Sequence, residues 1–422
     1  MRTPIIITTF AVLVPTAASA GGYLVPSMSP RDLGLTQAAV ADEEGPAALS
    51  LNTAALAGGE GLTIGLSAGV LSNRTDWSEP ALGSASQSQT NFPPSIGISY
   101  GGKLAHDQAW AVGVGFGTPA GGSLKWPDGW AGREFIESVK QQVFAVGAGA
   151  AFQLLPTVKF GVSYVRFQAT EEIHQSLNFL DHFGEAHLGL AGGGDSFGVA
   201  TEFQVAPLPL HIGITYSHAA NLDLTGHVHF SSVPPAFVAQ LHDQGISETV
   251  LIPDVLTIGG AYRVAPNLTI MASYEFEHWS DYKSDTFTGT DVMTGPDGVP
   301  THFTTSVTRN YNDAHVIRLA GEWKQIPVMP QLTARLGLQR SISDQPTDTL
   351  SPSLTDASSW GIAVGAGYRI TPNLGVDLGY EHVFFDEVTA SGSDAFPGSY
   401  RTAVDLLSLG IGWHTDFGAH KQ

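Results

Sequence analysis

The feature of this chain that most limits its fold is an alternation of apolar with small or polar residues that recurs from Leu62 to Phe417. Segments of about ten residues carry it, the length and pattern of a β-strand that crosses a membrane. Successive side chains of a strand point to opposite faces, so one face would meet lipid and the other the interior. In the last segment one face holds Leu407, Leu409, Ile411, Trp413, Thr415 and Phe417. The pattern predicts an outer-membrane β-barrel.

Residues 1–20 resemble a secretory signal. Arg2 provides a positive start, Ile5–Val14 is a short apolar core and Ala18-Ser19-Ala20 is a small-residue cleavage site. The core is shorter than the roughly 18 residues that a spanning helix needs, and no later stretch reaches that length. We therefore expect residues 1–20 to be a signal peptide that is removed on export.

The composition agrees with an exported barrel. Only 14% of the residues are charged and 49 are glycine, which suits strands with small inward side chains. The chain has no cysteine, in agreement with export to an oxidising compartment. A net charge of −20 argues against a nucleic-acid partner, which would require a basic face. A soluble secreted β-protein is the other class that this composition allows.

Turn signals set the number of strands. Six short connections are expected, at Lys103–Asp107, Leu155–Thr157, Ala206–Pro209, Ala265–Asn267, Gln325–Pro330 and Thr371–Asn373. All but the first contain proline, a strong turn former. Long loops alternate with them, at residues 73–91, 119–139, 171–195, 221–253, 281–309, 343–357 and 389–401. Six turns and seven loops join fourteen strands, and barrels of this class have an even strand number, short periplasmic turns and long outer loops.

Residues 59–417 are therefore predicted to form an all-β transmembrane fold, a 14-stranded antiparallel outer-membrane β-barrel, followed by a tail at 418–422. Residues 21–58 lack the alternation and are rich in alanine. We expect them to form a plug, or hatch, inside the lumen. A disordered periplasmic tail is the alternative, and the apolar residues of this segment disfavour it. They include Leu49, Leu51 and Leu56.

Charged residues occur on strand faces that we expect to point inward. They are Arg263, Glu275, Glu277, Arg318, Glu322, Arg335, Asp377 and Glu381. Both signs are present, so a lattice of structural salt bridges across the lumen explains most of them, because buried ion pairs are more often structural than functional. A role in transport is the alternative for a single member.

Short motifs follow one another in a fixed order along the chain. In the plug region they are Gly34, Ala41-Asp42-Glu43 and Asn52-Thr53-Ala54-Ala55-Leu56-Ala57. Further along they are Trp130-Ala131-Gly132-Arg133, Gly194-Asp195-Ser196-Phe197-Gly198, Trp279-Ser280, Asn312-Asp313-Ala314, Arg318-Leu319-Ala320-Gly321, Gly365-Ala366-Gly367-Tyr368, Asn373-Leu374 and Asp377-Leu378-Gly379-Tyr380. Each motif is weak alone, but their order over nearly the whole mature chain resembles the FadL family of outer-membrane transporters for long-chain fatty acids and other hydrophobic compounds.

Two positions depart from the pattern of that family. Thr53 stands where the family has a proline, which predicts a looser turn in the plug. Asn312 stands where fatty-acid members carry a lysine that helps to hold the ligand carboxylate. An amide brings no charge, and charge-assisted hydrogen bonds are about twice as strong as neutral ones. The resemblance implies fatty-acid uptake, and Asn312 leaves neutral or aromatic hydrocarbons open as the alternative.

The resemblance also implies a route for the ligand: capture between the third and fourth outer loops, passage to an inner pocket, and exit sideways through the wall. The expected ligand contacts are Asn52, Phe179, Phe183, Phe237, Leu241, Asn312 and Arg318. Of these, Phe237 and Leu241 are spaced to share one face of a short helix. Exposed apolar loop residues often form a binding surface, and packing of the loops into a cap is the equal alternative.

The family's lateral opening lies at its third strand, which in this chain is Ala109–Thr118. Gly113, Gly115 and Gly117 alternate there, and rows of glycine weaken a strand or mark a kink. They are the predicted lateral opening. The alternative is that a narrow barrel requires inward glycines in any case.

Other functions fit the sequence less well. Of its fifteen histidines, His227 and His229 lie close together, but no set has a zinc-site spacing, so we expect no metal and no cofactor. Nothing singles out a catalytic triad, as an outer-membrane lipase or other enzyme would require. A general porin would lack the plug. The expected partners are a hydrophobic ligand and the lipid and lipopolysaccharide of the cell outer membrane, and the expected state is a monomer.

Overall fold

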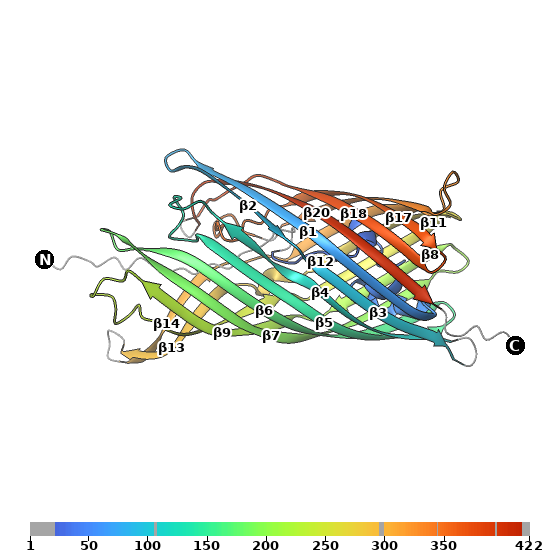
Figure 1. Cartoon of the computed structure of the whole chain (residues 1–422), viewed down its shortest axis with the longest axis horizontal. Coiled ribbons are helices and arrows are strands. Elements are labelled where there is room, and N and C mark those ends of the chain that lie inside the picture. Colours follow the sequence, from blue (N-terminus) through green and yellow to red (C-terminus); the bar gives the residue numbers. More distant parts are fainter. Residues whose placement is uncertain (1–21, 105–107, 295–298, 344, 393–394, 416–422) are drawn as a thin grey trace.

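A closed ring of antiparallel strands forms the wall of the protein, and short helices lie inside it (Figure 1). The computed structural model describes residues 22–104, 108–294, 299–343, 345–392 and 395–415. The expected signal peptide at 1–20 and the tail at 418–422 lie outside these residues. No helix in the described part of the chain is long and apolar enough to cross a membrane.

The wall contains fourteen strands, as predicted. In order they are β1 (Gly61–Glu79), β2 (Gly83–Asn91) with β3 (Pro94–Lys103), β4 (Ala109–Lys125), β5 (Ser138–Leu155), β6 (Val158–Asn178), β7 (Phe183–Gln204), β8 (Leu210–Ser217), β11 (Val255–Ala265), β12 (Leu268–Glu277), β15 (Ala314–Trp323), β16 (Leu332–Ile342), β17 (Ser359–Thr371), β18 (Leu374–Phe385) and β20 (Ser399–Thr415). β2 and β3 follow one another along β1 and form one wall strand. β20 pairs with β1 over most of its length and closes the ring.

The remaining strands belong to the outer connections. β9 (Ala220–Ser231) and β10 (Gln244–Ile252) follow β8, β13 (Ser284–Thr294) and β14 (Pro300–Thr308) follow β12, and β19 (Val388–Thr389) follows β18. β9 pairs with the outer half of β7, and β10 pairs with β9 and with β13. A 3-10 helix, η4 (Trp279–Asp281), precedes β13. The sheet therefore continues well beyond the ends of several wall strands.

The predicted long loops at 73–91 and 171–195 are mostly strand, whereas the one at 119–139 is confirmed between the end of β4 at Lys125 and the start of β5 at Ser138. Residues 171–195 are mostly the outer halves of β6 and β7, which pair without interruption up to Asn178 and Phe183. Residues 73–91 are likewise the hairpin of β1 and β2. Alternation persists through these segments, but the apolar residues move to the inward face.

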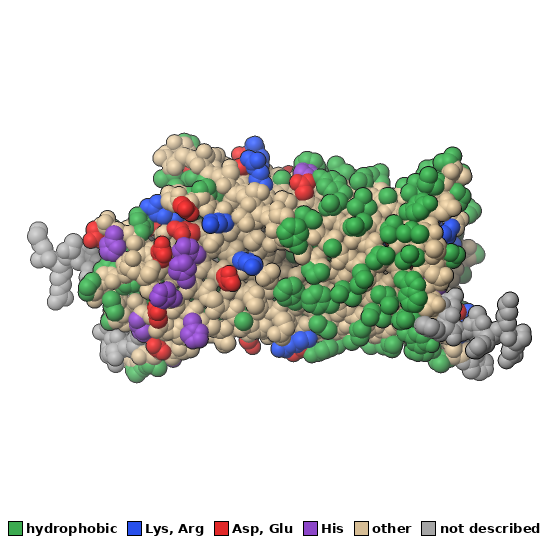
Figure 2. Space-filling view, viewed as in Figure 1, with side chains coloured by type: hydrophobic (Ala, Val, Ile, Leu, Met, Phe, Trp, Pro, Cys, Tyr) green, Lys and Arg blue, Asp and Glu red, His purple; other side chains and the backbone are tan. Residues whose placement is uncertain are grey.

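This exchange of faces is visible in β6. Phe160, Val162 and Tyr164 are exposed on the outside, whereas Phe167 and Ile173 are apolar residues buried on the inside. Apolar side chains accordingly cover one half of the exterior, and charged residues and histidines gather on the other half (Figure 2). An apolar exterior faces lipid and a polar one faces water, so the exchange marks the outer boundary of the membrane. We call the part beyond this boundary the outer domain.

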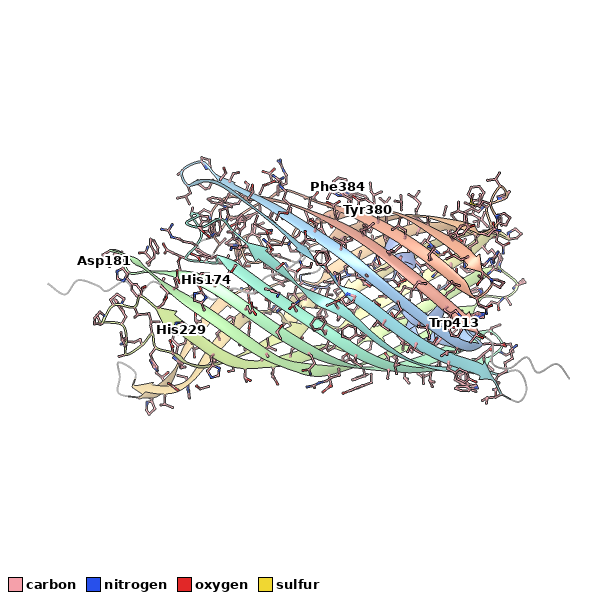
Figure 3. The ribbon with its side chains drawn as sticks, viewed as in Figure 1. His174, Asp181, His229, Tyr380, Phe384 and Trp413 are labelled. Carbon is pink, nitrogen blue, oxygen red and sulfur yellow. The ribbon has the colours of Figure 1, made fainter. Side chains whose placement is uncertain are left out.

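Tyrosines mark the same boundary. The hydroxyl of Tyr164 donates to Asp195 (2.5 Å), and that of Tyr380 donates to Asp405 (2.6 Å). Aromatic rings with one wet end favour the membrane–water interface. Trp413 lies near the opposite, periplasmic end of the apolar band (Figure 3).

The N-terminal helices lie inside the lumen, as predicted for the plug (Figure 1). They are α1 (Pro30–Gly34), η1 (Gly45–Ala47), α2 (Ala48–Leu51) and η2 (Thr53–Gly58). Inward glycines of the wall make room for their backbone. A Cβ on Gly379 would lie 2.3 Å from the carbonyl oxygen of Pro30, and one on Gly213 would lie 2.3 Å from that of Val40. The backbone of the plug therefore packs directly against wall glycines, where any larger residue would collide with it.

Candidate ligand pathway

A cavity of about 960 Å³ lies between the plug and the wall. This volume is near the upper end of the range for small-molecule sites. Its apolar lining includes Met28, Leu49, Leu56, Phe116 and Phe167. The plug supplies the first three and the wall the last two, so any displacement of the plug changes the shape of the cavity.

The charged side chains of the lining are mostly acidic. The carboxylates are Asp42, Glu43, Glu44, Glu202, Glu275, Glu277 and Asp377, and the cations are Arg31, Lys159, Arg318 and Arg335. Each of these cations already contacts a carboxylate. Lys159 Nζ lies 2.9 Å from Glu202, and Arg318 lies 2.7 Å from Glu275. The predicted lattice of salt bridges is confirmed for Arg318 and Arg335, whereas Arg263 is exposed at the periplasmic end of β11.

One buried carboxylate ties the plug to the wall. Glu322 of β15 lies 3.1 Å from Arg31 of α1, 2.9 Å from Arg335 of β16 and 3.2 Å from Lys324. Its side chain is fully buried. Arg31 also lies 3.4 Å from Glu43 within the plug. We call Glu322 and its three cationic partners the plug anchor.

Asn52 forms hydrogen bonds inside the lumen, as predicted. Its Nδ2 donates to the carbonyl of Val40 (2.6 Å), and its Oδ1 accepts from the backbone N–H of Ala54 (3.1 Å). The second bond caps the start of η2. Thr53, which follows, is buried and has its methyl group near Gly149 of the wall. Asn52 thus joins two segments of the plug and does not itself reach into the cavity lining.

Replacing Asn52 with alanine is expected to loosen the plug without unfolding the barrel. The change leaves the Val40 carbonyl and the Ala54 N–H buried without partners, which costs about 1–3 kcal/mol. We expect a several-fold change in the uptake of a hydrophobic solute, with unchanged heat-modifiability on gels. Ser50→Ala, at an exposed plug position that lines the cavity, shows how much a small change in the lining alone alters uptake. Unchanged uptake in the folded Asn52 variant would show that these bonds do not shape the path.

The wall is interrupted beside the cavity. β2 ends at Asn91 and β3 begins at Pro94, and Phe92 between them is 72% exposed. β3 pairs with β4 only as far as Ile96 and Phe116. Pro94, Ile96 and Phe116 also line the cavity. The interruption therefore lies where the cavity meets the wall.

The N-terminal segment covers the inner side of this interruption. The backbone N–H of Val25 donates to Pro119 of β4 (2.8 Å), and that of Gly121 donates to Tyr23 (3.0 Å). At this point β4 thus bonds to the start of the plug on one side, while it shifts register against β5 between Gly117 and Ala120 on the other. The start of the plug is therefore hydrogen-bonded to β4 at the place where the pairing of the wall strands is irregular.

The glycines predicted for the lateral opening lie next to this place. A Cβ on Gly113 or Gly115 would lie 3.2 or 3.3 Å from Leu49 of the plug, so packing against the plug accounts for both. A Cβ on Gly117 would meet nothing within 4 Å, and Gly117 lines the cavity. The lateral opening stays a prediction, and it rests on Gly117 and the β2–β3 break more than on the row of glycines.

Two of the predicted capture residues meet at the outer end. The rings of Phe179 and Phe237 have centroids 5.3 Å apart, and we call this pair the aromatic clamp. The N–H of Leu241 donates to the carbonyl of Phe237 (2.8 Å), which gives the helical turn expected from their spacing. Phe183 instead lies under the guanidinium of Arg133, 3.8 Å from its ring centroid.

The clamp and the cavity are separate. None of Phe179, Phe237 and Leu241 lines the cavity, and Asn312 is exposed between β14 and β15, also outside the cavity lining. Of the predicted ligand contacts, only Arg318 belongs to the lining. The structure therefore does not bring these residues into one site.

Sequence reasoning missed a large buried core that fills the outer domain. Trp126 and Trp130 stack with centroids 4.4 Å apart, and Trp77 and Phe396 pack against Trp130. This core lies between the clamp and the cavity, because it contains the inward residues of the outer strand halves. The exchange of apolar residues from the outward to the inward face was the signal that could have revealed it.

Serines in a Gly-x-Ser-x-Gly arrangement do not form an enzyme site here. The three such runs begin at Gly65, Gly97 and Gly194 and lie within β1, β3 and β7. A nucleophile elbow requires a sharp strand-to-helix turn instead. These runs are part of the strand alternation.

A lipid-facing barrel with a plugged lumen and an internal cavity between plug and wall is the architecture of an outer-membrane transport channel. Residues 11–413 match the family described as "Outer membrane protein transport protein (OMPP1/FadL/TodX)". The chain belongs to this family of outer-membrane transporters of hydrophobic compounds.

Two similar sequences are both named as outer membrane proteins. The chain is 26% identical over 214 residues to the 47 kDa outer membrane protein of Pasteurella multocida, a match that covers 48% of this chain and 46% of that protein. It is 26% identical over 210 residues to outer membrane protein P1 of Haemophilus influenzae, a match that covers 48% of this chain and 41% of that protein. The matches thus span less than half the length of these relatives. The protein is located in the outer membrane.

Solved structures share the fold. A Pseudomonas aeruginosa FadL homologue has a TM-score of 0.81 at 16% identity, covering 94% of this chain and 100% of that one. The Pseudomonas putida toluene transporter TodX has a TM-score of 0.72 at 14% identity, and the match covers 95% of this chain and 100% of that one. The Ralstonia pickettii toluene transporter TbuX has a TM-score of 0.67 at 18% identity, and the match covers 90% of this chain and 98% of that one.

Proposed function

We propose that this protein takes up neutral hydrophobic compounds, hydrocarbons and their uncharged derivatives, across the outer membrane. The observation that supports this choice is the charge of the cavity, whose acidic side chains outnumber its basic ones. A ligand carboxylate that enters the cavity meets a lining with more carboxylates than cations. At 4 Å and an effective dielectric constant of 20, two unpaired like charges repel by about 4 kcal/mol.

The paired state of the cations supports the same choice. A carboxylate ligand would have to compete with the protein carboxylates that already pair with Arg31, Lys159, Arg318 and Arg335. Breaking a buried pair leaves an uncompensated charge and is strongly unfavourable. A neutral solute requires only apolar contact, which the Leu49 and Phe116 side chains offer.

The proposed route has three stages. The aromatic clamp captures the solute at the cell surface, the cavity receives it, and the break between β2 and β3, beside β4, releases it sideways into the membrane. The separation of clamp and cavity by the outer core implies that the core rearranges between the first two stages. The solute avoids the charged outer leaflet of lipopolysaccharide on this route.

The sequence analysis placed long-chain fatty acids first and neutral or aromatic hydrocarbons second. The exposed position of Asn312 outside the cavity lining and the acidic lining favour the second class. Two of the similar structures are named toluene transporters, which fits a neutral solute. Uptake of fatty acids is kept as the competing outcome of the test.

The test compares a long-chain fatty acid with its alcohol and its alkane of equal length. We expect purified protein in detergent to bind the alcohol at least as tightly as the acid, and the affinity for the acid to change little with ionic strength. Tight binding of the carboxylate that is lost at high salt would contradict the proposal and favour fatty-acid uptake.

Phe237→Ala is expected to weaken capture of the alcohol about tenfold. Burial of a phenylalanine side chain contributes roughly 1.5–3 kcal/mol, and each 1.4 kcal/mol is a factor of ten in affinity. Val238→Ala is the control, since Val238 is a 49% exposed neighbour on the same turn. Equal binding by the Phe237 variant and the wild type would mean that the clamp only packs the loops together.

A further inference from the structure

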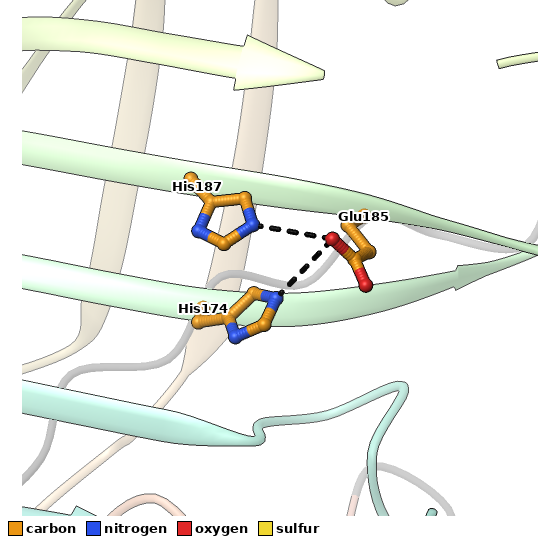
Figure 4. Close-up of side chains that lie close together, drawn as sticks. All are labelled: His174, Glu185 and His187. Atoms are coloured by element: carbon orange, nitrogen blue, oxygen red, sulfur yellow. Dashed lines mark hydrogen bonds and ion pairs between the residues drawn. The ribbon is translucent and has the colours of Figure 1, made fainter. Parts of the chain in front are cut away.

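Three polar side chains converge on the outward surface of the outer domain (Figure 4). His174 of β6 and His187 of β7 are direct cross-strand partners, and their rings stack with centroids 3.8 Å apart at an angle of 20°. Glu185 Oε2 lies 3.4 Å from His187 Nε2 and 3.9 Å from His174 Nε2. The three atoms that could bind an ion thus lie within 4.8 Å of one another.

We propose that His174, Glu185 and His187 bind a divalent transition-metal ion of the Zn²⁺ type. Two imidazole nitrogens and one carboxylate oxygen are a common zinc ligand set, and they leave a fourth position for water. Imidazole ligands favour zinc, copper and nickel over magnesium and calcium. Ligand bonds of about 2.0–2.2 Å require the three atoms to approach one another, and the two stacked rings must turn about their side-chain bonds so that their in-plane lone pairs converge on the ion.

The surroundings of His174 prepare it as a ligand. Glu137 Oε2 lies 3.3 Å from His174 Nδ1, so the proton of the ring is held on that nitrogen. Ser176 in turn donates a hydrogen bond to Glu137. A carboxylate behind the ring is the usual second partner of a metal-binding histidine, because it fixes the ring and the tautomer.

The other nitrogen of this ring is left with its lone pair available. His174 Nε2 is buried and has no hydrogen-bond partner within the described part of the chain. Buried polar atoms normally find a partner, so an unpartnered one requires an explanation. A metal ion between the two rings and Glu185 supplies that partner.

The site was not visible in the sequence because its members come from two strands. The expectation of no metal was drawn from spacing within single segments and from His227 and His229. His229 is the cross-strand partner of His187 on β9, but its Nδ1 lies 2.5 Å from Asp243. It therefore belongs to a separate pair and not to the proposed site.

The test is calorimetric titration of Zn²⁺ into the purified full-length protein in detergent at pH 7.5. We expect one site, and at least tenfold weaker binding in both His174→Asn and His187→Asn. Glu137→Gln, which keeps every direct ligand, is expected to weaken binding about 10–100-fold. His302→Asn, at an exposed histidine of β14, is the control and should bind like the wild type.

Folding of each variant is checked by heat-modifiability, which these outward-facing changes should leave intact. A tenfold excess of Mg²⁺ should not displace the Zn²⁺, because Mg²⁺ prefers oxygen ligands and binds imidazole nitrogen weakly. No Zn²⁺ binding by the wild type, or binding that falls equally in the His302 control, would overturn the proposal. Binding that survives in both His174→Asn and His187→Asn would do the same.

Discussion

Glu322→Ala is expected to open the lumen to ions while the barrel stays folded. The change removes the carboxylate that faces Arg31, Arg335 and Lys324 in the plug anchor. Removal of one partner of a buried ion pair costs up to about 3–5 kcal/mol when the remaining charge has no other partner. Here each of the three cations keeps one carboxylate, at Glu43, Asp377 and Glu44, so the cost is below that limit. Here the cations of wall and plug would then repel each other across the contact that holds α1.

The barrel itself should survive this change, because its backbone ladder between β15 and its neighbours does not depend on the Glu322 side chain. The measurement is conductance in planar lipid bilayers. We expect rare, small openings for the wild type and larger or more frequent openings for the variant, with unchanged heat-modifiability.

Glu44→Ala provides the matched control for this experiment. Glu44 also contacts Lys324, but its side chain is 58% exposed, and exposed ion pairs contribute little. Its conductance should stay near that of the wild type. A folded Glu322 variant with wild-type conductance would show that packing of α1 against wall glycines such as Gly379 holds the plug without the anchor.

The parts of the fold that depend on local chemistry were predictable from the sequence. Proline turns such as Ala265–Asn267 fixed the strand count, since turn geometry is set by the residues of the turn itself. The absence of alternation in residues 21–58 was sufficient to place them apart from the wall. Both predictions needed no knowledge of contacts between distant residues.

The outer domain was mispredicted for a physical reason. An outward apolar residue identifies a strand only where the exterior is lipid, and beyond Tyr164 the exterior is water. Alternation continued there with the opposite sense, and the segments were therefore assigned to loops. The contact of Arg31 with Glu322 could not be predicted at all, because it joins residues far apart whose charges have several alternative partners.

The candidate site was predicted only in part for a related reason. The spacing of Phe237 and Leu241 is a local property, and the helical turn was found as expected. The contact of Phe179 with Phe237, by contrast, depends on how two outer connections meet in space. The acidic balance of the cavity depends on which charged residues from many strands face one space, which strand parity alone does not specify.

The outer domain is expected to be more stable at pH 5.5 than at pH 8. Glu171 of β6 and Glu248 of β10 are buried there, and their carboxyl groups interact electrostatically. Burial raises the pKa of Glu171 to about 7. Burial, followed by the charges of Glu171 and Asp285, raises the pKa of Glu248 well above its usual value, and Arg309 opposes both shifts only partly.

The direction of this pH dependence follows from the difference in proton binding between the folded and unfolded states. Both carboxyls bind protons more tightly in the folded than in the unfolded state, so folding takes up protons near neutral pH. The stabilisation is fully present below the unfolded pKa of about 4.3 and is lost as pH rises through about 7, the folded pKa of Glu171. For Glu171 alone the shift corresponds to roughly 3–4 kcal/mol at 1.36 kcal/mol per pKa unit.

Glu171→Gln should therefore stabilise the outer domain at pH 8 and flatten its pH dependence, because the amide keeps a hydrogen-bond donor and acceptor without a titrating charge. Urea denaturation followed by the fluorescence of the buried Trp126 and Trp130 measures this stability. Glu172→Gln, at the exposed neighbouring position, should retain the wild-type pH dependence. A wild-type urea midpoint that rises from pH 5.5 to pH 8, or equal flattening in the Glu172 variant, would show that this buried carboxyl pair does not control the stability of the outer domain.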